Sequence, residues 1–332
     1  MKKLMLTTAL ASSLIASAAL AELKVSGALE VTLGSGETPA TGTKTNQGTT
    51  IGYENNINFS GGTKLANGTE LKITSGFEDS TIGDQSVHFI MGNTTIYVGT
   101  DQNGGGLDDG QSVPVIANAI EDGNKGLGVS YKGNGATIHN DDVIGLIQKT
   151  PMGTVSVAYA PKVGAAGSGD SAPSAVAKTG SGLAVGFSGG FGVEGLNVLA
   201  SHTTRDTVSL DAKEISMTNI GASYNFGSVT VGVQQHTIDD SNDSSTFTAG
   251  GEHKATSIGV VFAATDAISI GYQQGKLETK TSGKVDEDTK SLTVGYNLGG
   301  ATVTAQYTTV DSKGGTAGKD GEAIELRIKQ AY

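Results

Sequence analysis

The stretch EAIELRIKQAY at the end of the chain (residues 322–332) decides the fold, because its apolar and polar residues alternate without a break. Ile324, Leu326 and Ile328 fall on one face of an extended chain, and charged side chains fall on the other. Successive side chains of a β-strand point to opposite faces, so the pattern predicts a strand that is apolar on one side only. The stretch LKVSGALEVTL (23–33) repeats the pattern near the other end.

The same period of two recurs along the whole chain, and the face opposite the apolar one carries small or polar residues. It predicts sixteen strands, an even number, so both termini of the barrel lie at the periplasmic rim and the first and last strands can pair. Pairing them removes both unpaired edges of the sheet. The predicted strands are 23–33, 49–59, 69–78, 85–91, 94–100, 142–149, 153–160, 180–188, 195–203, 214–226, 228–238, 255–264, 267–278, 288–298, 301–310 and 322–332. The span 214–226 is the weakest of these, because Ile215 and Met217 are out of phase with Ile220.

Two further features favour a barrel that spans a membrane. Tight turns such as Gly227-Ser228 alternate with long polar connections such as 239–254, and outer-membrane barrels have short turns at one rim and long loops at the other. Aromatic residues sit at strand ends, where they form girdles at the membrane interfaces. The expected girdle residues are Phe59, Phe226, Phe262, Tyr296 and Tyr332. We therefore predict an all-β, transmembrane, antiparallel up-and-down barrel. A soluble sandwich or a Gly-rich solenoid is the alternative, and neither explains the girdles.

The N-terminal segment predicts export. Lys2 and Lys3 precede an apolar run that ends in Ala19-Leu20-Ala21, the small-x-small pattern of a signal peptidase site. We predict a signal peptide over 1–21 and a barrel over 22–332; a membrane anchor is the alternative, disfavoured by the short run. The full chain carries a net charge of −11, and removing two lysines leaves −11 − 2 = −13. Such an acidic chain is a poor partner for nucleic acid.

The chain resembles the general, non-specific porins of Gram-negative outer membranes, which are sixteen-stranded trimers. The resemblance is carried by INFSGG (57–62), by LANG (65–68) and by the terminal aromatic residue Tyr332. It implies a passive diffusion channel for small hydrophilic solutes and ions, surrounded by outer-membrane lipid and assembled as a homotrimer. An outer-membrane structural barrel or a surface adhesin with binding loops is the alternative function.

The resemblance also implies that the third long loop, 101–141, folds into the barrel and narrows it. Alternation at Leu127, Val129 and Tyr131 leaves a short extra strand open there. In the family an acidic loop faces basic residues on the wall, and we place Lys72 and Arg327 on the wall near mid-strand. The chain has only two arginines, which departs from the usual arginine cluster. The expected residues of the pore constriction are Asp101, Asp108, Asp109, Glu121, Asp122, Arg327 and Lys72.

The excess of acids at this constriction predicts a preference for cations. We expect no cofactor and no resident metal, although the loop acids leave a weak possibility of a Ca²⁺ site. We also expect no enzyme activity, because the five histidines are scattered along the chain without a local pairing pattern.

Overall fold

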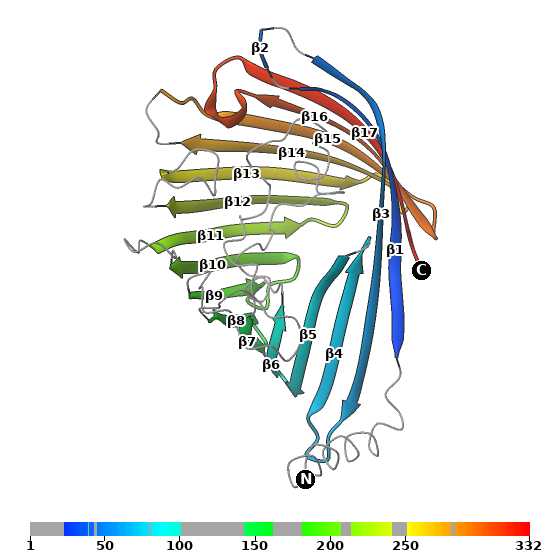
Figure 1. Cartoon of the computed structure of the whole chain (residues 1–332), viewed down its shortest axis with the longest axis vertical. Helices are drawn as coiled ribbons and strands as arrows, with labels where there is room; N and C mark the ends of the chain where they lie inside the picture. Colours follow the sequence, from blue (N-terminus) through cyan, green and yellow to red (C-terminus); the bar gives the residue numbers. More distant parts are fainter. Residues whose placement is uncertain are drawn as a thin grey trace, which may run out of the picture.

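The computed structural model describes residues 23–38, 40–42, 45–79, 81–100, 143–161, 181–206, 214–240, 251–279 and 283–332. Within these residues the chain forms a 17-stranded antiparallel sheet and one short 3-10 helix (Figure 1). No helix in these ranges is long and apolar enough to cross a membrane. The elements are β1 (Lys24–Thr38), β2 (Ala40–Thr41), β3 (Thr45–Lys64), β4 (Glu70–Glu78), β5 (Thr81–Met91), β6 (Thr94–Thr100), β7 (Val143–Thr150), β8 (Gly153–Ala160), β9 (Gly182–Gly189), β10 (Leu196–Asp206), β11 (Glu214–Asn225), β12 (Val229–Asp240), β13 (Gly251–Ala263), β14 (Ile268–Thr279), β15 (Glu287–Asn297), β16 (Ala301–Asp311), η1 (Lys313–Gly315) and β17 (Lys319–Ala331).

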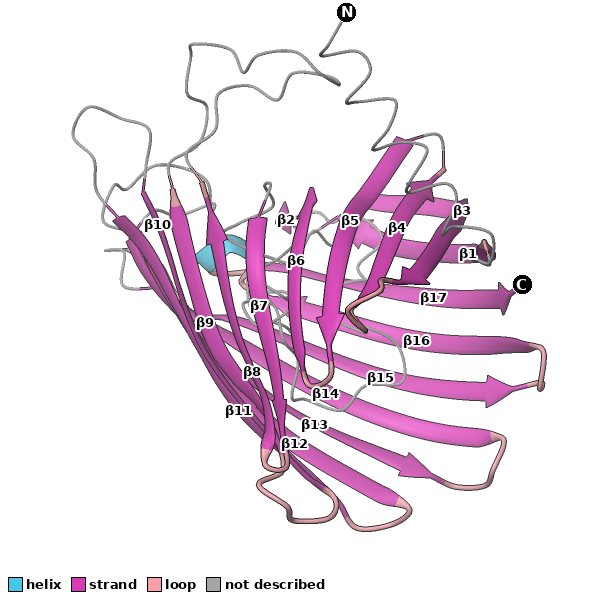
Figure 2. Ribbon diagram, turned by 90° about the horizontal axis from the view of Figure 1, so that it is seen from below, coloured by secondary structure: helices cyan, strands magenta, loops and turns pink. Residues whose placement is uncertain are grey.

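The sheet closes on itself. Strand β1 pairs with β3 on one side and with β17 on the other, and from β3 onward each strand pairs with the next. The strands therefore curve around a common interior (Figure 2). Apart from the two-residue β2, which pairs with the start of β17, the ring contains the sixteen predicted strands, and that prediction is confirmed.

Several strands begin earlier than the alternation predicts, always at the rim of the long connections. Strand β3 begins at Thr45, four residues before the predicted start at 49, and β17 begins at Lys319. The backbone ladder needs only N–H and C=O groups, so it continues where the outer face is no longer apolar. The strands therefore extend beyond the part of the wall whose outer face is apolar.

The predicted tight turns are present at the opposite rim, and their chemistry explains them. The Asn225 carboxamide oxygen accepts a hydrogen bond from the Gly227 N–H at 2.7 Å, and Asn297 does the same for Gly299 at 2.8 Å. Both glycines have positive φ, 92° and 85°. An Asn side chain that bonds two residues ahead, followed by a residue able to adopt positive φ, closes a short hairpin.

The barrel has its apolar residues outside and its polar residues inside. On β15, Leu292 is 50% exposed, whereas its neighbours Ser291 and Thr293 are 1% and 2% exposed. The expected girdle aromatics Phe226, Phe262, Tyr296 and Tyr332 are likewise exposed, and Phe59 is half-buried against Phe77, with 5.7 Å between ring centroids. A water-soluble protein buries most of its large apolar side chains, so an apolar outer face of this kind is typical of membrane-spanning barrels.

Strand β11 is continuous despite its broken apolar period. Met217 is 1% exposed and pairs with the buried Ile238 of β12, while Ile220 is 58% exposed on the outer face. Met217 therefore points inward, which is why it is out of phase with Ile220 in the sequence. Small apolar groups of this kind also occur elsewhere on the inner wall, as where Ala255, Val310 and Ala323 cluster.

The C-terminal residue, Tyr332, extends the pairing between β17 and β1, which is the seam where the barrel closes. The Tyr332 N–H donates to the Gly27 carbonyl at 2.9 Å, and the Gly27 N–H donates to the Tyr332 carbonyl at 3.0 Å. The Tyr332 ring crosses over Gly27, and its hydroxyl donates to Asn55 at 2.8 Å. A Cβ at position 27 would collide with the Asn56 carbonyl oxygen and lie 2.7 Å from the Tyr332 ring, so glycine allows both the close approach of β3 and the crossing of the ring.

Candidate functional site: the inner wall of the barrel

The inner wall is a polar surface whose side chains bond across strands. The hydroxyls of Ser291 on β15 and Thr308 on β16 lie 3.1 Å apart, and the Gln306 amide donates to Thr308 at 3.1 Å. On β11 and β12 the Gln234 amide donates to the Asn219 carbonyl oxygen at 2.9 Å. Hydroxyl and amide groups need hydrogen-bond partners, so such a wall suits an aqueous interior and would be costly against lipid.

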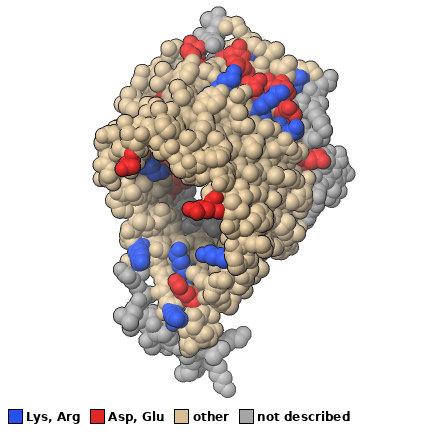
Figure 3. Space-filling model, turned by 180° about the vertical axis from the view of Figure 1, so that it is seen from behind, with Lys and Arg blue, Asp and Glu red and all other residues tan. Residues whose placement is uncertain are grey.

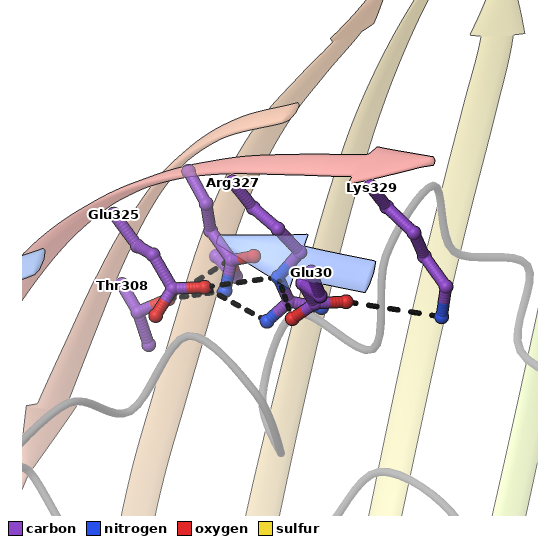
Figure 4. A network of polar contacts seen from close by, with 7 residues as sticks. Glu30, Thr308, Glu325, Arg327 and Lys329 are labelled. Carbon is purple, nitrogen blue, oxygen red and sulfur yellow. Dashed lines mark hydrogen bonds and ion pairs between the residues drawn. The ribbon is translucent and has the colours of Figure 1, made fainter. Parts of the chain in front are cut away.

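A cluster of charged side chains lies on this wall at the seam between β1 and β17. The Arg327 Nε donates to Glu30 at 3.0 Å across the seam, and Arg327 Nη2 donates to Glu325 on the same strand at 2.8 Å (Figure 4). Lys329 adds a longer contact to Glu30, at 3.8 Å. We call Glu30, Glu325, Arg327 and Lys329 the seam cluster.

The backbone explains why these residues meet. Glu325, Arg327 and Lys329 are two residues apart on one strand and therefore share a face. In the β1–β17 register Glu30 lies opposite Lys329 and Thr32 opposite Arg327, so Glu30 reaches Arg327 along the diagonal.

The seam cluster balances its own charge. It contains two cations and two carboxylates, and the Arg327 and Glu30 side chains are each 11% exposed, while Glu325 is 2% exposed. Charge-assisted hydrogen bonds to arginine are among the strongest in proteins, and a buried carboxylate without such a partner is costly. Arg327 thus holds two wall carboxylates, a role that its isolated position in the sequence did not predict.

The structure separates the two wall cations that we predicted to lie together. Lys72 is the third residue of β4, at the rim of the short turns, and not at mid-strand. In register, Arg327 lies opposite Thr32, Thr32 opposite Gly52, and Lys72 opposite Gly62, so the two cations are displaced by 62 − 52 = 10 residues along the strand direction. With about 3.3 Å per residue and about 4.8 Å per strand, they are roughly 36 Å apart along the wall.

The predicted acidic side of the constriction lies outside the described residues. The segment 101–142 is not described, and it contains all five expected acids, Asp101, Asp108, Asp109, Glu121 and Asp122. It also contains Leu127, Val129 and Tyr131 of the alternative extra strand. The infolded loop and the weak Ca²⁺ possibility at these acids therefore stay predictions. Within the described ranges no group of three or more His, Asp or Glu side chains is arranged to hold a metal ion.

Two features of the wall were missed from the sequence. The first is the pairing of Glu325 with Arg327, for which their spacing of two residues on one strand face is a usable signal. The second feature is a recess of about 300 Å³, which Lys64 and Glu70 line together with Lys72 and Lys24. Their proximity depends on strand register, which spacing in the sequence does not reveal.

A closed ring of sixteen strands with an apolar outside and a polar inside is the architecture of a channel-forming barrel of an outer membrane. A family model described as Gram-negative porin matches residues 7–315. The chain belongs to this family, whose members are outer-membrane channels.

Solved structures agree with the family assignment. A structure described as a porin superimposes with a TM-score of 0.66 at 15% identity, covering 94% of this chain and 100% of that one. The anion-selective porin from Comamonas acidovorans gives 0.64 at 15% identity, with 94% and 100% coverage. An outer-membrane protein of Vibrio cholerae in its trimer form gives 0.64 at 14% identity, with 94% and 99% coverage. A search of curated protein sequences finds no significant match. At sequence identities this low, the similarity to these structures shows the fold alone.

Proposed function

We propose that this porin is a passive diffusion channel for small hydrophilic solutes and ions. The observation that carries the proposal is the inverted wall, with Leu292 exposed on the outer face and Ser291 and Thr293 shielded on the inner one. A sixteen-stranded barrel is wide enough to leave an aqueous channel between its walls. Solutes small enough to enter would cross by diffusion, selected by the width of the channel and by the charges that line it.

Reconstitution into planar lipid bilayers tests this function. Purified protein should produce stepwise conductance increases that are linear in voltage and scale with salt concentration. Liposomes that contain the protein should also become permeable to small sugars and stay impermeable to large ones. Absence of both effects from protein with the folded far-UV spectrum would refute a diffusion channel and favour the structural-barrel or adhesin alternative.

We further propose a preference for cations, supported by the net charge of −11 and by the five acids expected at the constriction. An anion-selective porin shares this fold, so the fold itself leaves the sign of the preference open. The reversal potential across a KCl gradient measures it directly. Replacing Asp108 and Asp109 with Asn should move that potential toward anion preference, and an anion-selective wild-type channel would refute the proposal.

Export and assembly complete the proposed function. We propose that residues 1–21 are removed on export, that the apolar outer face contacts lipid, and that three copies assemble. The trimer form of the Vibrio cholerae protein with the same fold supports the last point. N-terminal sequencing of outer-membrane material should begin at Glu22, and crosslinking in detergent should stop at three copies. A mature chain that retains Met1, or one that sediments as a monomer in mild detergent, would contradict these steps.

A further inference from the structure

Three lysines gather on the inner wall at the rim of the short turns. Lys24 begins β1, Lys64 ends β3 and Lys72 lies near the start of β4, and all three line the recess of about 300 Å³. Short turns mark the periplasmic rim of an outer-membrane barrel, so the recess lies at the periplasmic mouth. On the face seen in Figure 3, basic side chains gather toward the lower end with an acidic side chain among them, and acids and bases also lie together at the upper end.

Strand register shows that the three lysines share the inner face. Lys24 has the same parity on β1 as Glu30 of the seam cluster, and Lys24 lies opposite Ser60 on β3. Lys64 is four residues beyond Ser60 and therefore faces the same way. Lys72 lies opposite Gly62, which shares that parity.

The register also sets the spacing of the lysines. Lys64 and Lys72 are diagonal neighbours on adjacent strands, about 7–8 Å apart at the backbone. Lys24 and Lys72 are two strands and two residues apart, roughly 12 Å along the wall. Lysine carries its charge on a flexible four-carbon stem, so the three ammonium groups can converge on one small molecule.

Gly62 lies at the centre of this triangle and has no side chain to fill it. Strands β3 and β4 approach closely there, since a Cβ on Gly62 would lie 2.9 Å from the Leu71 carbonyl oxygen. Glycine at a close approach of two strands leaves the floor of the recess open.

The charge of the recess is positive and not neutralised internally. Among the described residues that line it, Glu70 is the single acid, so their summed charge is 3 − 1 = +2. None of the three lysines forms an ion pair with a carboxylate of the described residues, and all three are exposed. The lysines on the outer face behave differently: Lys276 lies 2.8 Å from Asp286, and Lys254 lies 3.5 Å from Glu278.

We propose that this recess is a binding site for a small divalent oxyanion of the phosphate class, placed at the periplasmic mouth of the channel. A cleft lined by one sign of charge raises the local concentration of the opposite ion. Each ammonium group offers three donors, and phosphate offers several acceptor oxygens and a charge that matches +2. The inference rests on the proposed channel function and deepens it. The site would hold a phosphate-class anion at the periplasmic mouth of a channel whose net negative charge otherwise disfavours anions.

The test measures binding without requiring conductance. Inorganic phosphate is titrated into the folded, detergent-solubilised porin at pH 8 and low salt, and the ³¹P NMR linewidth reports the bound fraction. The combined Lys24→Gln, Lys64→Gln, Lys72→Gln variant should raise the apparent Kd by about tenfold or more, whereas the corresponding triple arginine variant should stay within about threefold of wild type. Acetate, with a single charge, should bind more weakly than phosphate to the wild type.

A matched control removes the same charge from the outer face. The Lys254→Gln, Lys276→Gln, Lys290→Gln variant should bind phosphate as the wild type does. Equal affinity of the inner-face glutamine variant and the wild type would overturn the site, as would an equal loss in the outer-face control or equal binding of acetate. If the triple glutamine variant fails to fold, Lys72→Gln alone should still raise the Kd about threefold, and no change there would also overturn the site. A channel that fails to conduct would refute the diffusion function and leave this binding result standing.

Discussion

Replacing Arg327 with Ala should destabilise the barrel strongly, because it leaves Glu30 and Glu325 on the wall without their arginine. Arg327 contacts Glu30 at 3.0 Å and Glu325 at 2.8 Å. A hydrogen bond to a charged group contributes about 1.5–3 kcal/mol, which gives about 3–6 kcal/mol for the two carboxylates. Removing one partner from a buried ion pair costs about 3–5 kcal/mol. We therefore expect the free energy of unfolding to fall by about 3–5 kcal/mol.

The assay is urea unfolding of the barrel refolded into detergent micelles, followed by far-UV circular dichroism and by the mobility of the folded band on an unheated gel. Coincident transitions by the two probes justify a two-state free energy. Lys290→Ala is the matched control, because Lys290 is 47% exposed and lies 4.0 Å from Asp311. An exposed pair of that kind contributes about 0–1 kcal/mol.

A combined variant separates charge from packing. Arg327→Ala together with Glu30→Gln and Glu325→Gln leaves no buried carboxylate without a cation, so it should recover a large part of the lost stability. A loss below about 1 kcal/mol in Arg327→Ala would refute the reasoning, since Arg327 would then behave as an exposed charge. A triple variant no more stable than Arg327→Ala would show that lost packing, and not charge, causes the effect.

Three further predictions concern the seam, a turn and the loop before β17. Gly27→Val would collide with the Asn56 carbonyl oxygen and with the Tyr332 ring, so it should cost about 1–3 kcal/mol by overpacking, measured by the same urea assay; unchanged stability would show that β1 does not need glycine here. Gly227→Val should cost about 1 kcal/mol or more because position 227 has φ 92°, whereas Ser228→Ala in the same turn should cost little. Burial, together with the nearby charge of Lys319, lowers the pKa of Lys313, so the unfolded chain binds more protons there and stability should rise with pH between that lowered pKa and 10.5. Lys313→Gln should abolish this part of the alkaline pH dependence. If the free energy of unfolding of the variant rises with pH across that range as much as that of the wild type, the prediction is wrong.

The architecture could be predicted from the sequence because alternation is a local property. The residue pattern of each strand indicates which of its faces is apolar, and the turn residues at Gly227 and Gly299 indicate where hairpins close. Counting sixteen such segments is enough to predict closure, since an open edge in hydrocarbon leaves unpaired backbone groups. Even Met217, which breaks the apolar period, keeps its parity: it points inward because β11 continues straight through it.

The chemistry of the inner wall depends on which residues of neighbouring strands lie side by side, and only the closed barrel decides that. Arg327 meets Glu30 because the last strand pairs with the first in one register, although the two residues are far apart in the chain. The same register places Lys72 beside Lys64 and far from Arg327. Alternation shows which face of the wall a charged side chain occupies. The position of that side chain along the barrel axis, and the residues beside it, depend on the register between paired strands. That register is set by the pairing of backbone N–H and C=O groups around the whole ring.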